Sequence, residues 1–457
     1  MPRVVRETLL SMRELAATVG PFVLIAIALL VGTYILLDPT PPKHVVLATG
    51  PAGSAYEAFG KRYAAELKRY GINVTLQPSI GSRENLRLLH DVKTRVDLAF
   101  VQGGSSEAAQ KLDEKDGEVE LVSLGSLFYE PVWLFYRTEK AKSLNREATL
   151  KQLAQLRGWR VNVGARGSGA PGLAAKLLAA NFIDREEIQR GSLEETPAVQ
   201  ALLAGEIDAM LMVSAPESPM VQMLLQTPGV KLFEFTQAEA YARRYPFISP
   251  VLLPRGVADL ARDVPPRDES LIATTTSLVA REGTHPALIQ LFVQAAARIH
   301  GNAGWIARAG QFPTPDRTEF ALAPEAERFY KTGAPVLQRY LPFSLANLID
   351  RMWVALFSIV VVLLPLSRLV PPLYQFRVRS RIFRWYRHLR RIEDRSEQDK
   401  VPAKELLAEL DNLDARASRI TVPLAYTDEL YALRQHIDLV RERLRNGGSA
   451  KPAGRES

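Results

Sequence analysis

Hydrophobic residues follow three patterns along this chain: long uncharged runs, short apolar runs that alternate with helical periods, and amphipathic periods near the C-terminus. The first uncharged run, Leu15–Leu37, is 23 residues long. As a helix it measures about 34 Å, enough to cross a hydrocarbon core of about 30 Å. A cleaved signal peptide is the alternative, but its apolar region has only about 7–15 residues, and Asp38-Pro39-Thr40 contains no small-residue cleavage pattern. We expect an uncleaved transmembrane helix at residues 15–37, after a cytoplasmic N-terminus at 1–14.

A second uncharged run extends from Met352 to Ser367. These 16 residues are marginal for a membrane span, but an apolar stretch ending at Phe376 extends them past Arg368, whose long side chain can reach the interface. A buried core helix is the alternative. Nine arginines from Arg368 to Arg395 disfavour it, because such charges flank the cytoplasmic side of a membrane helix. We expect a transmembrane helix at 351–376 and an Arg-rich juxtamembrane segment at 377–395.

The distribution of charge completes this topology. The chain has a net charge of +8, but residues 44–350 hold 34 basic and 34 acidic side chains. Most of the excess therefore lies beyond residue 350, where anionic lipids at the Arg-rich segment are the nearest partner, and nucleic acid is not expected. With Arg3, Arg6 and Arg13, the Arg-rich segment predicts that both termini are cytoplasmic. We expect residues 38–350 on the periplasmic side of a bacterial inner membrane.

Between the two runs, strand-like segments alternate with helical periods. His44–Thr49 has the pattern of a buried strand, and a Gly-rich loop leads from it to a helical period at Tyr56–Tyr70. The same order recurs along the segment, which is typical of an α/β fold with parallel strands covered by helices on both faces. Further strands are expected at 72–77, 96–102, 121–124, 131–136, 160–163 and 207–213, and helices at 173–181, 197–204 and 219–225.

This α/β segment of about 300 residues exceeds the usual size of a single hydrophobic core. We therefore expect two lobes with a cleft between them. Strand-like Pro131–Arg137 and Leu271–Arg281 are the expected crossings between the lobes. Lobe one then comprises residues 44–138 and 273–350, lobe two comprises 139–272, and residues 38–43 form a linker.

Residues 396–446 have the pattern of two amphipathic helices separated at Thr421-Val422-Pro423. Apolar residues recur at helical spacing in both, which predicts a helical hairpin. Two roles stay open for it. It is either a docking module, which pairs with a coiled-coil partner or a second copy through residues 402–446, or a hairpin that packs on itself. Residues 447–457 are expected to be disordered.

Three loops rich in glycine and serine follow strand-like segments and open helices: Gly50–Ser54, Gly81–Asn85 and Gly167–Gly169. One such loop alone is a tight turn about as often as a binding loop. Because ligands bind open α/β sheets at the carboxyl ends of strands, three loops spread over both lobes predict a shared cleft. N–H groups at helix starts and hydroxyl groups suit a carboxylate or another small anion. Gln102 ends a strand and is expected to point into the cleft, with Tyr56 in its wall.

Signatures of an enzyme are absent from the sequence. The chain has no cysteine, which excludes disulfides, iron–sulfur clusters and a thiol nucleophile. It has no G-x-S-x-G, H-E-x-x-H or P-loop motif, and the histidines between the two uncharged runs have no ligand spacing. We expect no catalysis, no cofactor and no metal.

Several segments resemble, in order and spacing, one family of transport proteins. They are ATGPAGSAYEAFGKRYA at 48–64, SIGSRENLRLLHDVKTRVDLAFVQGG at 79–104, YEPVWLFYR at 129–137 and VGARGSGAPGLAAKLLAANFI at 163–183. Over about residues 44–345 the chain is similar to the solute-binding subunit of TAXI-type TRAP transporters. The resemblance implies a type II periplasmic-binding-protein fold that closes on a small organic anion, a carboxylate or amino acid, and delivers it to a TRAP-type permease. It also implies ligand contacts from Gly50, Gly53, Ser54, Tyr56, Ser82, Asn85, Gln102, Ser168 and Ser214.

The chain departs from the usual pattern of that family in its anchoring and its tail. Ordinary members are secreted or carry a lipid anchor, whereas two spans and a tail of about 80 cytoplasmic residues are expected here. Pro51 stands beside Gly50, where family members often have a second glycine, and proline removes an N–H donor. The leading hypothesis is a membrane-tethered solute-binding protein for uptake. The alternative is a receptor that signals occupancy through the cytoplasmic helices.

Overall fold

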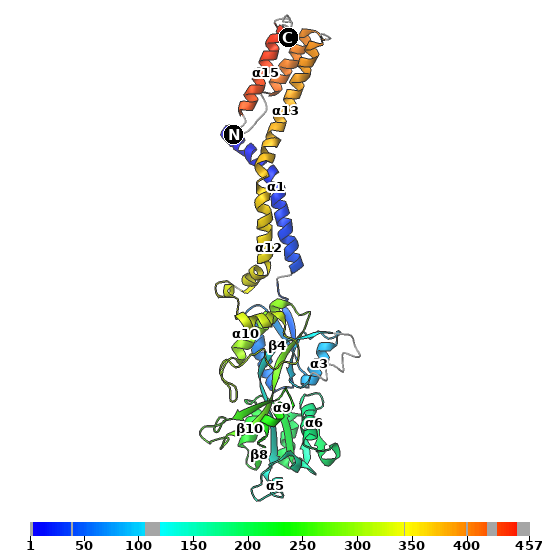
Figure 1. The fold of residues 1–457 in the computed structure, drawn as a ribbon, viewed down its shortest axis with the longest axis vertical. Coiled ribbons are helices and arrows are strands. Elements are labelled where there is room, and N and C mark those ends of the chain that lie inside the picture. Colours follow the sequence, from blue (N-terminus) through cyan, green and yellow to red (C-terminus); the bar gives the residue numbers. More distant parts are fainter. Residues whose placement is uncertain are drawn as a thin grey trace, which may run out of the picture. The chain divides into compact units, whose positions relative to one another are not determined.

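The computed structural model describes residues 3–37, 40–105, 119–341, 343–398, 401–417 and 427–445. The chain divides into two compact units (Figure 1). One unit is Thr40–Asn347, and the other combines Met1–Pro39 with Leu348–Ser457. The predicted break at 421–423 and the predicted disordered tail at 447–457 lie outside the described residues.

The unit of residues 40–347 is built on a ten-stranded sheet. Parallel strands form both ends of the sheet, because they come from the recurrent strand–loop–helix segments of the sequence. The strands at one end are β1 (His44–Ala48), β2 (Asn73–Gln77) and β3 (Leu98–Gln102), and those at the other end are β5 (Arg160–Asn162), β6 (Gln189–Gly191) and β7 (Ala209–Val213). The predicted α/β class is confirmed.

Two long antiparallel strands join these ends at the middle of the sheet. β4 (Leu121–Arg137) pairs with β10 (Glu269–Arg281) and then, through Val132–Tyr136, with β7. β10 pairs with β9 (Ser249–Leu253) through its first residues and with β3 through its last. The segments predicted as crossings lie in this pair, which takes part in both halves of the sheet.

The sequence predicts two strands where β4 is one. Residues between the predicted strands at 121–124 and 131–136 are also buried and pair with β10. Gly125, at φ +109°, lies between the two predicted segments, and a Cβ there would overlap the Tyr330 hydroxyl, which donates to the carbonyl of Leu124 (2.7 Å). Glycine therefore permits close packing against α11 (Pro324–Thr332) without ending the strand.

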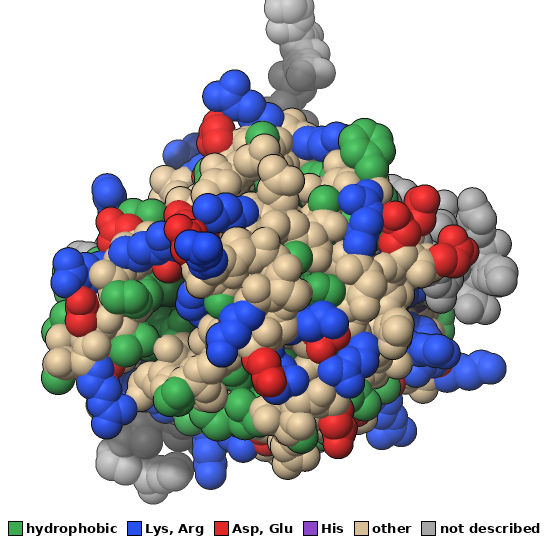
Figure 2. All heavy atoms as spheres, turned by 90° about the horizontal axis from the view of Figure 1, so that it is seen from below, with side chains coloured by type: hydrophobic (Ala, Val, Ile, Leu, Met, Phe, Trp, Pro, Cys, Tyr) green, Lys and Arg blue, Asp and Glu red, His purple; other side chains and the backbone are tan. Residues whose placement is uncertain are grey.

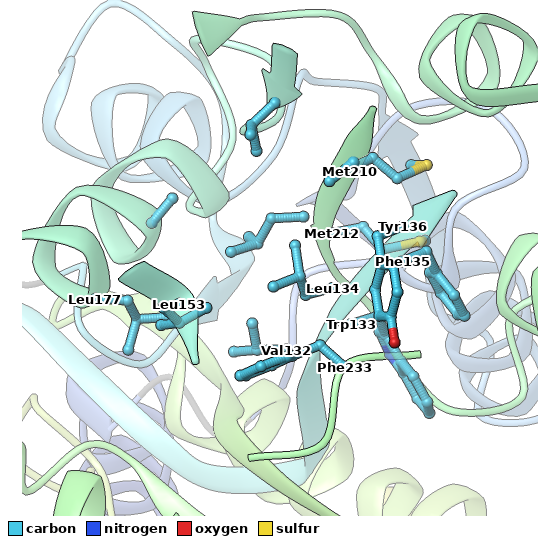
Figure 3. Close-up of a cluster of buried hydrophobic side chains, with 14 of the residues drawn as sticks. Val132, Trp133, Leu134, Phe135, Tyr136, Leu153, Leu177, Met210, Met212 and Phe233 are labelled. Carbon is cyan, nitrogen blue, oxygen red and sulfur yellow. The ribbon is translucent and has the colours of Figure 1, made fainter. Parts of the chain in front are cut away.

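Two large hydrophobic cores lie in this unit. One contains the fully buried rings of Tyr63, Phe100 and Phe292. The other contains Trp133 and Phe135, whose rings are parallel at 6.2 Å (Figure 3). Helices that contribute to the first core are α2 (Ala55–Lys68), α10 (Pro286–His300) and α11; those of the second are α5 (Thr138–Ala141), α6 (Ala170–Ala180), α7 (Glu195–Ala204), α8 (Pro219–Gln226) and α9 (Ala238–Arg244). α3 (Ser82–His90) packs in a smaller cluster beside β1 and β3, and β8 (Val230–Leu232) pairs with β4. Short 3₁₀ helices occupy Leu153–Leu156, Arg185–Glu187 and Val336–Arg339.

Charge is mixed over the surface of this unit. Figure 2 shows Lys and Arg side chains interspersed with Asp and Glu on the face that carries α5 and β8. The surface of this unit also carries ion pairs, such as Arg255–Asp263 (2.6 Å). No single-sign field covers the visible face, as expected from the equal numbers of acids and bases in residues 44–350.

The second unit contains two apolar stretches that are long enough to cross a membrane. Val19–Leu36 in α1 (Arg3–Leu37) has a mean hydropathy of 2.4, Met352–Phe376 has 2.2, and neither is buried inside the protein. The second stretch is not one helix: α12 (Phe343–Ser367) ends before α13 (Val370–Glu397) begins. Pro371 lies in the first turn of α13. Backbone N–H groups in the first turn have no acceptor within the helix, so the absence of an N–H from proline loses no hydrogen bond there.

The C-terminal helices form a bundle of three instead of an isolated hairpin. α14 (Ala403–Ala417) and α15 (Thr427–Arg445) contact one another and α13. Their common core consists of Ile382, Leu389 and Ile392 from α13, Leu406, Leu410 and Leu413 from α14, and Leu433, Ile437 and Val440 from α15. Two arginines of the Arg-rich stretch pair with acids of the hairpin, Arg379 with Glu429 (2.9 Å) and Arg395 with Glu409 (2.7 Å). The apolar stripes of the two predicted helices, for which a coiled-coil partner and self-packing both stayed open, are buried within this bundle.

Candidate functional site

A cavity of about 180 Å³ lies between loops that end the strands of both sheet halves. One half contributes the loops after β1 and β2 and the last residue of β3, and the other contributes the loops after β5, β6 and β7. These strand ends are where open α/β sheets bind ligands. The predicted site residues that line the cavity are Gly53, Ser54, Tyr56, Ser82, Gln102, Ser168 and Ser214.

The loop after β1 presents the start of α2 to the cavity. Ser54 caps the helix by accepting the N–H of Glu57 at Oγ (3.3 Å). Gly53, at φ +79°, donates its N–H to the Glu57 carboxylate (2.7 Å). The N–H groups of Ala55 and Tyr56 have no acceptor among the described residues, as is usual in the first turn of a helix. Both residues line the cavity, so this loop offers it two free N–H donors.

Two predicted ligand contacts, Gly50 and Asn85, lie behind the cavity wall. A Cβ at Gly50 would stand 2.7 Å from the Oγ of Ser54, so the glycine leaves room for the helix cap. Asn85 is fully buried, and its amide donates to the carbonyls of Thr49 (2.8 Å) and Phe100 (2.9 Å). Because both amide hydrogens are used inside the protein, Asn85 fastens the ends of β1 and β3. Its predicted ligand contact is corrected to a structural role.

Gln102 directs an unpaired amide into the cavity. Its backbone N–H donates to the Oγ of Ser82 (2.8 Å), which fixes the end of β3. The Gln102 residue is only 4% exposed, and its side-chain amide has no hydrogen-bond partner among the described residues. Neither atom of this amide is enclosed by protein without a partner, so the amide is open to the space of the cavity. This amide is therefore suited to a polar group of a bound solute.

Glu130 and Glu195 line the cavity and were not predicted. Glu130, on β4, is 3% exposed and accepts the hydroxyl of Tyr56 at Oε2 (3.0 Å). Burial raises the pKa of Glu130 to about 7, and the nearby charge of Glu195 also raises it. Burial likewise raises the pKa of Glu195, at the start of α7, to about 7. One signal was available in the sequence: Glu130 is the single acid in a 17-residue, mostly buried strand.

Loops of the other sheet half complete the wall. Ser168 donates its Oγ hydrogen to a carbonyl of its own loop (2.8 Å). The carbonyl of Ser214 accepts the indole N–H of Trp133 (2.9 Å), so this tryptophan belongs to the core and also holds the loop after β7. Asn162 accepts the N–H of Leu193 at Oδ1 (2.8 Å), which ties the loop after β6 to the end of β5. Protein contacts therefore hold this side of the cavity in place.

Glycines bring the loops of the two halves into contact beside the cavity. The N–H of Glu84, on α3, donates to the carbonyl of Gly167 (3.2 Å). A Cβ at Gly167 would stand 2.8 Å from the Cβ of Ile80, and one at Gly169 would overlap the amide oxygen of Gln102. The predicted Gly-Ser loops meet edge to edge because neither glycine has a side chain.

The cavity wall is acidic. Glu130, Glu194 and Glu195 line it, and no Lys, Arg or His does so within the described ranges. Apolar side chains, including Ile80 and Met210, form much of the remaining wall. In the part of the chain that the structure describes, no three His, Asp or Glu side chains are grouped to hold a metal ion. The wall thus combines N–H donors, carboxyl groups and apolar surface.

The cavity lies within the part of the chain that matches a known protein family. The sequence pattern of the NMT1-like family matches residues 47–311, and all the cavity-lining loops lie within this range. Together with the two-halved α/β unit, this match confirms the predicted periplasmic-binding-protein-like fold.

Solved structures of binding proteins are similar to this chain at low identity. The alkanesulfonate-binding protein SsuA from Xanthomonas axonopodis pv. citri, bound to MOPS, has 17% identity over 45% of this chain and 69% of that one, with a TM-score of 0.32. PhnD1 from Prochlorococcus marinus in complex with methylphosphonate has 12% identity over 57% and 85%, with a TM-score of 0.38. MatC from Rhodopseudomonas palustris with bound malate has 16% identity over 70% and 100%, with a TM-score of 0.37.

Proposed function

Because this chain belongs to the NMT1-like family, we propose that it is an extracytoplasmic solute-binding protein that captures a small organic anion, a carboxylate or an amino acid. The observation that carries the proposal is the cavity at the strand ends. Loops of both sheet halves line it, and it contains unpaired N–H and amide donors. Concave sites with a few converging polar groups are typical of small-molecule binding. The protein binds and releases its solute without chemical change.

We further propose that the two apolar stretches tether the binding unit to a bacterial inner membrane. Val19–Leu36 and Met352–Phe376 flank this unit in the sequence, and arginines follow the second stretch and precede the first. Positive charge on those sides supports cytoplasmic termini and a periplasmic binding unit. The resemblance to TAXI-type subunits supports a TRAP-type permease as the partner that receives the solute, and the remaining arginines of residues 368–395 support contact with anionic lipids.

A receptor is the second candidate function. The observation that favours it is the three-helix bundle of α13, α14 and α15, which has its own hydrophobic core and is not needed to tether a binding domain. Deletion of residues 402–457 distinguishes the two functions. Unchanged solute uptake supports transport, whereas retained binding with a lost cellular response supports a receptor.

The proposed function is tested by ligand binding to the full-length chain in detergent. Small carboxylates and amino acids are screened for an increase in melting temperature, since a bound solute stabilises the folded state by mass action. We expect Gln102→Ala to weaken binding of the best solute roughly 5- to 150-fold, equivalent to 1–3 kcal/mol, and to leave the melting temperature of the free protein nearly unchanged.

Asn85→Ala is the matched comparison, because Asn85 lies on the same side of the fold but outside the cavity. We expect it to lower the melting temperature of the free protein, since it leaves the carbonyls of Thr49 and Phe100 buried and unpaired. Parent-like binding by Gln102→Ala would show that the cavity is not the binding site.

A further inference from the structure

The acids of the cavity wall indicate that the solute contains more than a carboxylate. Glu130 and Glu195 line the same cavity, and the charge of Glu195 raises the pKa of Glu130. No basic side chain lines the cavity within the described ranges. When these carboxyl groups are ionised, a solute with only negative charge adds a further like charge, and the described wall has no cation to compensate it, which disfavours binding. An ammonium group of the solute would supply the missing cation.

The start of α2 provides a separate place for an anion in the same cavity. The free N–H groups of Ala55 and Tyr56 stand at the positive end of this 14-residue helix. The unpaired amide of Gln102 is a further donor in the wall. The two backbone N–H groups are suited to a single carboxylate and cannot accept from an ammonium group. The Gln102 amide can donate to the carboxylate through Nε2 or accept from an ammonium group through Oε1.

Tyr56 connects the two places. Its backbone N–H belongs to the free first turn of α2, and its hydroxyl donates to Glu130 (3.0 Å). The anion-binding and cation-binding groups are therefore one tyrosine side chain apart, within the reach of a small solute. The rest of the wall includes the apolar side chains of Ile80, Leu193 and Met220, which suit an apolar or uncharged substituent.

We propose that the solute is an amino acid with one carboxylate, one ammonium group and an uncharged side chain, and that Glu130 and Glu195 bind its ammonium group. The inference rests on the proposed function, because it assigns the chemistry of the same cavity. It excludes dicarboxylates and acidic amino acids as the preferred solutes, because no basic side chain of the described residues lines the cavity to bind a second carboxylate.

The test is calorimetric titration of the full-length chain in detergent with each of the twenty L-amino acids and with succinate. The tightest amino acid is then compared with the carboxylic acid that lacks only its amine, such as 4-methylpentanoate for L-leucine. We expect an amino acid with an uncharged side chain to bind at least 100-fold more tightly than its amine-free counterpart.

The outcomes separate this inference from the proposed function. An amine-free acid or succinate that binds as tightly as any amino acid overturns the inference and leaves the solute-binding function standing. A tightest amino acid with a charged side chain overturns it as well. If no amino acid, matched acid or succinate binds, both the inference and the proposed function are wrong.

Isosteric variants locate the ammonium site. We expect Glu130→Gln and Glu195→Gln each to weaken binding of the amino acid at least 10-fold and to weaken binding of its amine-free counterpart much less. Glu239→Gln, an exposed change on α9 that removes the same charge, is the matched control and should bind as the parent does. If Glu130→Gln does not fold, Glu195→Gln at the start of α7 gives the same readout. Equal losses for both solutes would contradict the assignment.

Discussion

Burial gives Glu130 an unusual protonation equilibrium. The carboxyl faces Tyr56 on α2, Thr276 on β10 and Glu195 on α7, and no cation faces it from the described wall. Its pKa in the folded protein is raised to about 7, above the ordinary glutamate value. Between these two pKa values the folded protein binds more protons than the unfolded chain, so the free protein loses stability as the pH rises through this interval.

We predict that Glu130→Gln reduces this pH dependence. The free parent protein should lose on the order of 3 kcal/mol from this group between about pH 4.5 and pH 7, and the variant should lose correspondingly less. The measurement is the free energy of unfolding as a function of pH at constant ionic strength, with Glu239→Gln as the control. Parallel curves for the parent and Glu130→Gln would show that Glu130 titrates normally.

Residues at strand ends could be predicted from the sequence, and residues inside strands could not. Ser54, Ser82 and Gln102 follow apolar strands, and the ends of parallel strands meet at one edge of a sheet. Glu130 is the single acid of its segment, which marks it as unusual, but the sequence does not tell whether its carboxyl group faces a cavity or a partner inside the protein. The resemblance to TAXI-type subunits implies a ligand contact from Asn85, but its position on α3 turns its side chain toward the sheet.

At the level of elements, the loop before α6 and the loop before α3 touch through glycine. Gly167 accepts the N–H of Glu84 and leaves no room for a Cβ beside Ile80. The contact connects the two sheet halves next to the cavity, so a side chain there would separate them locally without disturbing either hydrophobic core.

We predict that Gly167→Ala weakens solute binding about 10-fold and speeds solute release, because the added methyl group keeps these loops apart. The melting temperature of the free protein should change little. Gly172→Ala, in α6, has no neighbouring atom within 4 Å of the added Cβ and is the matched control. Binding constants and dissociation rates measured for both variants check this prediction, and equal affinities would show that the loop contact is not needed for binding.

The sequence predicted most elements of the binding unit but not how the C-terminal hairpin is completed. Apolar residues recur at regular spacing in the strand–loop–helix repeats. The observed β1, α2, α7 and α8 therefore lie close to their predicted ranges. In α13, by contrast, Ile382, Leu389 and Ile392 are separated by arginines. The basic composition suggested a lipid-facing segment, and the sparse apolar stripe that packs on α14 and α15 was missed.

At the level of the whole molecule, the proposed topology can be tested because the chain has no cysteine. Ser143 is exposed in the binding unit, and Gln398 is exposed after α13. We predict that a membrane-impermeant maleimide labels Ser143→Cys but not Gln398→Cys in intact spheroplasts, and labels both after the membrane is permeabilised. The unmodified chain is the control for background labelling. Labelling of Gln398→Cys in intact spheroplasts would place the bundle outside and contradict the topology.

The pairing of β4 with β10 has a mechanical consequence for the binding unit. The two chain segments that pass between the sheet halves are hydrogen-bonded neighbours from Leu121 to Pro131 and from Ala273 to Arg281. A double-stranded ribbon of this kind flexes and twists, but it resists the sliding and swivelling that two independent tethers would allow. Opening of the cavity by bending this ribbon would therefore store elastic strain, and release of that strain would return the same side chains to their former positions around the next solute molecule.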